Sequence, residues 1–123
     1  MRELKTFLHD GVCPIRDILS RLGDKWSLLT LVALRANGTM RFSEIRKAIG
    51  DISQRMLSVT LRSLEEDGLI NRKIYPEVPP RVEYTLTHSG ESLMPHLNRL
   101  VDWALNNSQR IVSAREMYNE KGG

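Results

Sequence analysis

The sequence predicts a mainly α-helical fold of the α+β class that carries one small β-hairpin. Apolar residues recur at helical spacing in four short segments between residues 14 and 66, and again after residue 88. Between residues 70 and 86 they alternate as in strands, on both sides of a proline-rich loop at 76–80 that cannot pair in a ladder. Short helices, a hairpin and a long last helix are the order of elements in a winged helix-turn-helix.

Length and composition indicate one ordinary globular domain. The chain has 123 residues, of which 41% are hydrophobic and 27% charged. Its formal net charge of +3 permits a polyanionic partner without requiring one. The first residues alternate in charge where a signal peptide needs an apolar core, and the longest apolar run, at 28–34, is too short to span a membrane. We therefore expect a cytoplasmic protein.

Residues that could support metal binding or catalysis are sparse. Cys13 is the single cysteine, and the three histidines, at positions 9, 88 and 96, have no ligand-like spacing. A glycine-rich phosphate loop, a nucleophile elbow and an HExxH pattern are all absent from the sequence. We expect neither an enzyme nor a metal or other cofactor.

The first two segments predict helices at 14–22 and 24–37. Pro14 can open the first helix and Gly23 can end it. Four apolar residues of this helix share one face by their spacing: Ile15, Ile18, Leu19 and Leu22. Asp24 can cap the second helix, which is apolar on nearly all sides and is therefore expected at the centre of the core.

A third helix is expected at 44–49, after a short extended connector at 39–42, and a fourth between Ser53 and Gly68. Ser43 and Ser53 are the predicted N-caps of these two helices. In the fourth helix one apolar stripe, which we expect to face the core, consists of Leu57, Leu61 and Leu64.

The opposite face of the fourth helix carries side chains suited to reading DNA bases. Arginine pairs with guanine edges, glutamine with adenine, and a small apolar group meets the thymine methyl. The acidic end at 65–67 would repel DNA, so the N-terminal half is expected to enter the major groove. The expected base contacts are Gln54, Arg55, Ser58, Val59 and Arg62. The alternative is that this face is only the solvated side of a core helix.

The two strand-like runs predict a hairpin, the wing, that flanks this reading helix. Ile70, Arg72 and Ile74 share one side of the first strand, and Val82, Tyr84 and Leu86 one side of the second. In a winged helix-turn-helix, basic and hydroxyl groups around the reading helix approach the phosphates, with Arg72 and Lys73 as alternatives in the first strand. The expected backbone contacts are Arg41, Ser43, Arg46, Lys47, Ser53, Arg72, Lys73 and Arg81.

The C-terminal segment predicts a long helix and a homodimer interface. Thr87 can cap a helix whose apolar stripe continues to residue 112, further than one small core can cover. The expected interface residues are Ile15, Leu93, Leu97, Leu100, Val101, Trp103, Ala104 and Leu105. Pro95 either bends this helix or marks a late start. The alternative is a helix that lies back on its own domain.

These elements give the expected division of the chain and the expected DNA target. A lead-in at 1–12 precedes the winged helix-turn-helix at 13–87, a dimerisation helix follows at 88–112, and residues 113–123 are expected to fray. Two reading helices related by a two-fold axis reach successive major grooves, so the operator in double-stranded DNA should be an inverted repeat.

Cys13 has two interpretations. If Pro14 is the first helical residue, Cys13 lies at the cap position, where the helix dipole and free amides favour a reactive thiolate that could sense oxidants or electrophiles. The alternative is a small buried hydrophobe in a Cys-Pro turn. Because the chain has no second cysteine, a disulfide would have to join two copies or involve a small thiol.

Seven blocks of sequence, in order between residues 13 and 90, also carry a resemblance. They are Cys13-Pro14-Ile15, Gly23-Asp24-Lys25-Trp26, Arg41-Phe42-Ser43-Glu44-Ile45, Ile52-Ser53-Gln54-Arg55-Met56-Leu57, Leu64-Glu65-Glu66-Asp67-Gly68-Leu69-Ile70, Tyr75-Pro76-Glu77-Val78-Pro79-Pro80-Arg81-Val82-Glu83-Tyr84 and Leu86-Thr87-x-x-Gly90. Together they resemble the HxlR family of bacterial winged-helix transcription regulators, over about residues 13–103. The resemblance implies a cytoplasmic homodimer on an inverted-repeat operator, acting as repressor or activator, and in several relatives a redox-sensing cysteine at the place of Cys13.

The expected function is therefore sequence-specific binding of double-stranded DNA in transcription regulation, with a redox or electrophile response through Cys13 as one interpretation. The alternative is a winged helix that serves as a protein–protein interaction module. That alternative calls for more apolar anchors and fewer guanidinium groups on the reading helix than Arg55 and Arg62 provide. A small effector stays an open partner, because no set of residues identifies its pocket.

Overall fold

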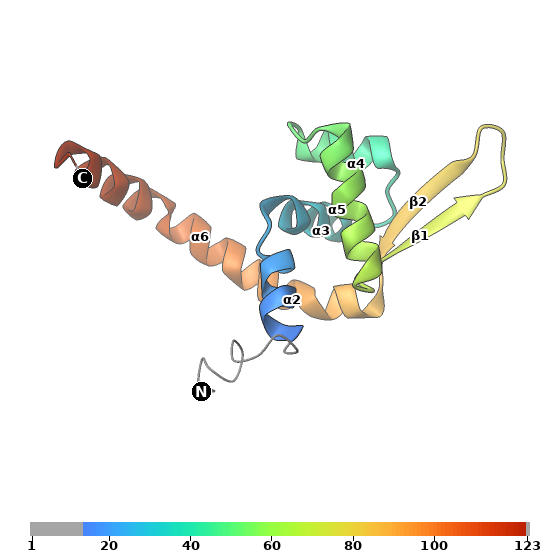
Figure 1. Cartoon of the computed structure of the whole chain (residues 1–123), viewed down its shortest axis with the longest axis horizontal. Coiled ribbons are helices and arrows are strands. Elements are labelled where there is room, and N and C mark those ends of the chain that lie inside the picture. The colour runs from blue at the N-terminus through green and yellow to red at the C-terminus, as the bar shows by residue number, and fades with distance from the viewer. Residues whose placement is uncertain (1–13, 123) are drawn as a thin grey trace.

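Seven helices and strands make up the part of the chain that the computed structural model describes, residues 14–122. In chain order they are α2 (Pro14–Leu22), α3 (Lys25–Asn37), α4 (Phe42–Ile49), α5 (Gln54–Glu66), β1 (Ile70–Tyr75), β2 (Arg81–Leu86) and α6 (His88–Glu120). In Figure 1 the hairpin and the outer part of α6 project on opposite sides of the other helices. The predicted fold class, mainly helical with one hairpin, is confirmed. None of the described helices is long and apolar enough to cross a membrane.

Three predicted caps explain where helices begin. The Asp24 carboxylate accepts a hydrogen bond from the Ser27 N–H at 3.1 Å, and α3 starts at the next residue. Ser53 Oγ accepts from the Met56 N–H at 3.0 Å at the start of α5. Thr87 Oγ1 accepts from the Gly90 N–H at 3.0 Å at the start of α6. Each side chain satisfies one of the amides that a first turn leaves without a partner.

The predicted start of α4 is wrong by two residues. The helix begins at Phe42 rather than Glu44, with Arg41 and not Ser43 at the cap position. The reason is the Glu44 carboxylate, which accepts a hydrogen bond from the Arg41 N–H at 2.8 Å and so stabilises an earlier first turn. Ser43 therefore lies exposed inside the first turn of α4.

The core forms around α3, as its apolar character predicts. This helix packs against α2, α4, α5, α6 and β2. Twelve apolar side chains are buried in one cluster: Leu31, Leu34, Met40, Ile45, Ile52, Leu57, Leu61, Leu64, Ile70, Tyr84, Met94 and Leu97. One side of α3 is nevertheless open, because Leu29 is 45% exposed.

The hairpin is antiparallel, and the residues predicted to share one side of each strand do so. Arg72 lies opposite Tyr84 and Ile74 opposite Val82, and the connecting loop contains a cis Val78–Pro79 bond. Only the base of the hairpin enters the core, since Ile70 is buried whereas Ile74 is exposed. Met40, expected in an extended connector, pairs with Tyr84 through two backbone hydrogen bonds of 2.8 and 3.0 Å, which fixes the hairpin beside α4.

The junction between the hairpin and α6 depends on a close backbone approach. A Cβ atom at Gly90 would collide with the Leu69 carbonyl oxygen, so this position accepts only glycine without a shift. Thr87 donates from its hydroxyl to the Gly68 carbonyl at 2.6 Å and from its amide to the Leu69 carbonyl at 3.0 Å. The Thr87-x-x-Gly90 block thus holds the start of α6 in contact with the residues that follow α5.

The 33-residue helix α6 has two unlike halves. Its first ten residues contain its only buried side chains among the described residues, Met94 and Leu97, so the core crosses the expected boundary at residue 88. From residue 98 to residue 122 none is buried. The late start considered for Pro95 does not occur, and Figure 1 shows α6 bending as it leaves the other helices.

The frayed tail expected from residue 113 is also corrected. The helix continues to Glu120, because residues such as Ala114, Arg115, Glu116 and Met117 favour helix and the next glycine is Gly122.

Candidate nucleic-acid interface

The reading helix α5 presents two opposite faces. Leu57, Leu61 and Leu64 are 0–2% exposed and hold the helix to the core, as predicted. The five residues expected to contact bases are all exposed: Gln54, Arg55, Ser58, Val59 and Arg62. Within residues 14–122 the guanidinium groups of Arg55 and Arg62 have no hydrogen-bond or ion-pair partner. The outer face therefore offers two unpaired cations, an amide, a hydroxyl and a half-exposed Val59.

The N-terminus of α5 lies beside α4 and several polar groups. Arg46 Nε donates to the Ile52 carbonyl at 3.1 Å and so fixes the turn between the two helices. Lys47 extends from the same helix, exposed and without a partner among the described residues. An open hollow between α4 and α5 is lined by Phe42, Ser43, Arg46, Lys47, Gly50 and Gln54. Cations and first-turn amides that converge in this way suit a phosphate group.

The basic residues of the wing differ in the number of partners that they have within the chain. Arg81 stacks on the Tyr75 ring at 4.0 Å and forms ion pairs with Glu77 (3.2 Å) and Glu83 (3.4 Å). Lys73 Nζ lies 4.9 Å from the centre of the same ring and makes no ion pair in the described chain. Of the wing cations expected to contact DNA, Lys73 is therefore freer than Arg81.

Arg72 belongs to the acidic end of α5 rather than to an open surface. Its Nε lies 3.4 Å from Glu65 Oε1, on the wall of a groove between α5 and the wing. This groove is lined by Phe42, Ser58, Leu61, Arg62, Glu65, Arg72 and Tyr84. Burial raises the pKa of the Tyr84 hydroxyl above its ordinary value, and the nearby Arg72 partly opposes this effect.

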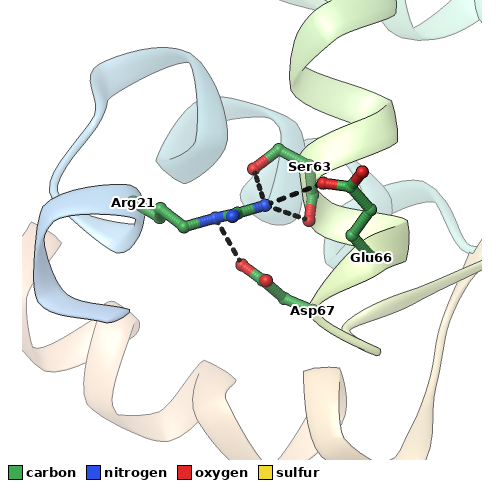
Figure 2. A network of polar contacts seen from close by, with 4 residues as sticks. All are labelled: Arg21, Ser63, Glu66 and Asp67. Carbon is green, nitrogen blue, oxygen red and sulfur yellow. Dashed lines mark hydrogen bonds and ion pairs between the residues drawn. The ribbon is translucent and has the colours of Figure 1, made fainter. Parts of the chain in front are cut away.

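Arg21 neutralises the other two acidic residues at this end, a role that the sequence did not reveal. Figure 2 shows its guanidinium directed from α2 to the last turn of α5. Nη2 lies 3.1 Å from Glu66 Oε1, and Nε lies 3.0 Å from Asp67 Oδ2. The hydrogen bond to Glu66 is the main cause that raises the pKa of Arg21, burial opposes it, and the charge of Asp67 adds a smaller increase. All three acidic residues are therefore paired within the chain, although Glu65 lines the same groove as Ser58 and Arg62.

Apolar side chains remain uncovered on α2 and on the outer half of α6. Five of the eight predicted interface residues, all on the outer half of α6, are exposed: Leu100, Val101, Trp103, Ala104 and Leu105. Leu97 was a wrong choice for an interface, because it is only 6% exposed and belongs to the core, against which the half-buried Leu93 also packs. Ile15 is half-buried.

The prediction missed several exposed apolar residues on these surfaces. They are Ile18, Leu19, Val112, Met117 and Tyr118. The first helix was expected to be a second dimer surface, but Ile15 was the only one of its residues named for it. The stripe is partly open: Ile18 and Leu19 are exposed, whereas Ile15 and Leu22 are half-buried.

Two further predictions concern Cys13 and metal binding. Cys13 lies outside residues 14–122, so its environment is not defined. Within those residues, no group of three or more histidine, cysteine, aspartate or glutamate side chains could hold a metal ion.

Comparison with known proteins gives consistent matches over most of the chain. The family model for the HxlR-like helix-turn-helix matches residues 21–112. An HTH-type transcriptional regulator of Methanothermobacter thermautotrophicus is 51% identical over 92 residues, which cover 75% of this chain and 70% of that protein. The structure of the transcriptional regulator YtfH from Salmonella typhimurium superposes with a TM-score of 0.79 at 43% identity, covering 89% of this chain and 96% of that one.

A third similar protein is the transcriptional regulator YodB of Bacillus subtilis, solved in two forms. The reduced form has a TM-score of 0.65 at 37% identity and covers 76% of this chain and 91% of that one. The diamide-treated form has a TM-score of 0.65 at 36% identity, with 79% and 96% covered.

Proposed function

This chain belongs to the HxlR-like helix-turn-helix family of DNA-binding transcriptional regulators, and from that premise we propose that it acts in the cytoplasm as a homodimer on an inverted-repeat operator. The observation that carries the proposal is the outer face of α5, where Arg55 and Arg62 are exposed and without partners in the described chain. Guanidinium groups left free on a helix that fits the major groove are suited to guanine edges. The functional class agrees with the expectation that the chain is not an enzyme.

The surrounding cations have the complementary role of positioning. Lys47 near the end of α4 and Lys73 on the wing are both exposed, and both lack an ion pair in the described chain. Contacts of such groups with phosphates fix the register of the protein on DNA without reading sequence. Arg41, Ser43 and Ser53 are exposed nearby and complete this set. Arg46, Arg72 and Arg81 join it only by giving up or sharing their partners within the chain.

The homodimer is supported by the outer half of α6. A helix of 33 residues is about 50 Å long, and none of its side chains after Leu97 is buried among the residues that the structure describes. Trp103 is 53% and Leu105 69% exposed, which is costly for a monomer in water. A second copy related by a two-fold axis would cover this surface and the exposed face of α2. It would also turn the second reading helix toward a neighbouring major groove in the inverted orientation.

The proposal is tested by selecting bound sequences from random duplex DNA with the full chain. We expect enrichment of two inverted half-sites, a solution mass of twice 14.1 kDa by sedimentation equilibrium, and affinity that falls steeply with salt. The slope of log affinity against log salt should be about −0.9 for each phosphate contacted. A failure to enrich any sequence, together with salt-independent association, would support a protein-interaction module instead.

A second candidate property, redox control through Cys13, is favoured by the comparison with YodB. That regulator was solved in a reduced form and after treatment with diamide, a reagent that oxidises thiols. Cys13 is the single cysteine of this chain and directly precedes α2, whose exposed apolar face is part of the proposed dimer surface. Oxidation of this thiol to a disulfide between two copies, or with a small thiol, would change the start of α2 and thereby the dimer.

Diamide treatment of the wild-type protein and of Cys13→Ser tests this second property. We expect diamide to weaken operator binding by the wild-type protein, to leave the variant unaffected, and to be reversed by a reducing agent. An equal loss of binding in both proteins would exclude Cys13 as the sensor.

A further inference from the structure

Arg21 links two parts of the molecule that the proposed function assigns to different tasks. It lies in the last turn of α2, and its side chain makes four polar contacts with the end of the reading helix α5 (Figure 2). Nη2 donates to the Ser63 carbonyl at 3.1 Å, to Ser63 Oγ at 2.6 Å and to Glu66 Oε1 at 3.1 Å. Nε forms an ion pair with Asp67 Oδ2 at 3.0 Å. These partners are more than 40 positions away in sequence.

The geometry of this contact is that of a rigid joint. Nη2 makes three of the four contacts, and Nε adds an ion pair without a hydrogen bond. Two nitrogens of one planar group thus restrict both the distance and the angle between the elements that they join. Its position at the C-terminal end of α5 also places a cation where the helix leaves carbonyl groups without partners and where its dipole is negative. The side chain is 32% exposed, so part of this network is shielded from water.

Leu19 lies on the other side of α2 from Arg21 and is 61% exposed. Ile18, three residues before Arg21, is 48% exposed and lines an open hollow beside Asp67 and Leu93 of its own chain. In the proposed homodimer these residues pack against the second copy, whereas Arg21 grips α5 of its own chain. The helix α2 thus lies between the partner subunit and the reading helix.

We propose that Arg21 is a positioning residue for operator recognition: it transmits the geometry of the dimer to α5 and so sets the separation of the two reading helices. This inference rests on the proposed function, because it requires two copies on one operator. Arg21 is at the opposite end of α5 from Arg55 and touches no residue of its open face. Its loss should therefore change which half-site spacing is bound, and not how a single half-site is read.

The test measures affinity for three kinds of duplex with the full chain. These are the selected operator, versions whose half-sites are moved by one or two base pairs, and a single half-site. The variants are Arg21→Ala, which removes the joint, Arg21→Lys, which keeps the charge without the fork, and Glu66→Gln, which weakens one contact. Arg35→Ala is the matched control, because within residues 14–122 Arg35 forms a single exposed ion pair, with Glu91 at 3.6 Å.

We expect the preference for the correct spacing to fall about fivefold or more in Arg21→Ala, in the usual range for coupling between two sites, and to fall in Arg21→Lys as well. Affinity for the single half-site should stay within about twofold, and Arg35→Ala should behave as the wild-type protein. If Arg21→Ala does not fold, Arg21→Lys and Glu66→Gln carry the same measurement.

Two outcomes would overturn the inference in distinguishable ways. Variants that melt at a lower temperature but keep the wild-type spacing preference would assign Arg21 a purely structural role. A wild-type protein without any spacing preference would overturn the proposed binding to an inverted repeat, and this inference with it.

Discussion

The two ends of the reading helix α5 differ in charge and in what holds their charges. Near the N-terminus, Arg55 has no side-chain partner within residues 14–122. Arg62, in the second half of the helix just before the acidic residues, has none either. At the C-terminus, all three acidic residues are paired: Glu65 with Arg72, and Glu66 and Asp67 with Arg21. One end is available to a polyanion, and the other is used to attach the helix to its own domain.

The same distinction divides the basic residues of the whole chain. Arg21, Arg46 and Arg81 are engaged by carboxylates, carbonyls or an aromatic ring, whereas Lys47 is free in the described chain. Charge counted along the sequence does not separate these groups. The two groups differ in whether the folded chain provides a partner for the cation. The cations without such a partner are those that DNA phosphates or bases can neutralise.

The largest expected effect is on the free energy of unfolding, and it compares substitutions of two nearby residues on opposite faces of α5. Leu57→Ala removes a side chain that is 0% exposed and should reduce the free energy of unfolding by about 2–5 kcal/mol. Val59→Ala, at a position that is 53% exposed, should change it by less than about 0.5 kcal/mol and yet lower operator affinity. Urea denaturation and fluorescence anisotropy measure the two quantities. Equal losses of stability in both variants would contradict the assignment of faces.

The next effect concerns the free end of α5. Arg55→Ala should weaken binding to the selected operator by about 1–3 kcal/mol and relax the preference at the base pair that Arg55 contacts. Stability should stay unchanged, because Arg55 has no partner to lose in the described chain. Arg35→Ala is the control of equal charge outside this face. A uniform loss of affinity over all duplexes would show that Arg55 contacts phosphates and not bases.

A smaller effect is on the salt dependence of DNA binding, and it compares Lys73, which has no ion pair in the described chain, with the ion-paired Arg81. Lys73→Ala should reduce the salt slope of binding by about one, as expected when one phosphate contact is lost. Arg81→Ala should leave the slope nearly unchanged, because Arg81 is already paired with Glu77 and Glu83. Titrations at several salt concentrations measure both slopes. Equal changes would mean that Arg81 leaves its carboxylates when DNA binds.

Most of the fold was predictable because its signals are local. Caps such as Asp24, Ser53 and Thr87 act within three residues, and the alternation that predicts the hairpin spans six. The misplaced start of α4 is also local, since Ser43 is a good cap by type, but Glu44 bonded the Arg41 amide instead.

The partners of charged side chains were not predictable, because they depend on long-range placement. Arg21 and Glu66 are 45 positions apart, and nothing in either neighbourhood indicates the pair. Periodicity likewise cannot say which molecule covers an apolar stripe. The stripe of α6 divides at Leu97 into a part buried in its own chain and a part left open, and only the folded chain shows where the division falls.

The smallest expected effect lies in the groove between the second half of α5 and the wing. Tyr84 is buried there between the free Arg62 and the paired Glu65 and Arg72, and its pKa is raised chiefly by burial. A neutral hydroxyl favoured by the fold contributes stability below the ordinary pKa of about 10, and this contribution is lost as the pH rises above that value. The free energy of unfolding of the wild-type protein should therefore fall more steeply than that of Tyr84→Phe between about pH 9 and about pH 11, the range in which an ordinary tyrosine loses its proton. Because the charge of Glu65 also raises this pKa, Glu65→Gln should make the decline smaller and end it at lower pH, and identical curves for all three proteins would exclude Tyr84 as its source.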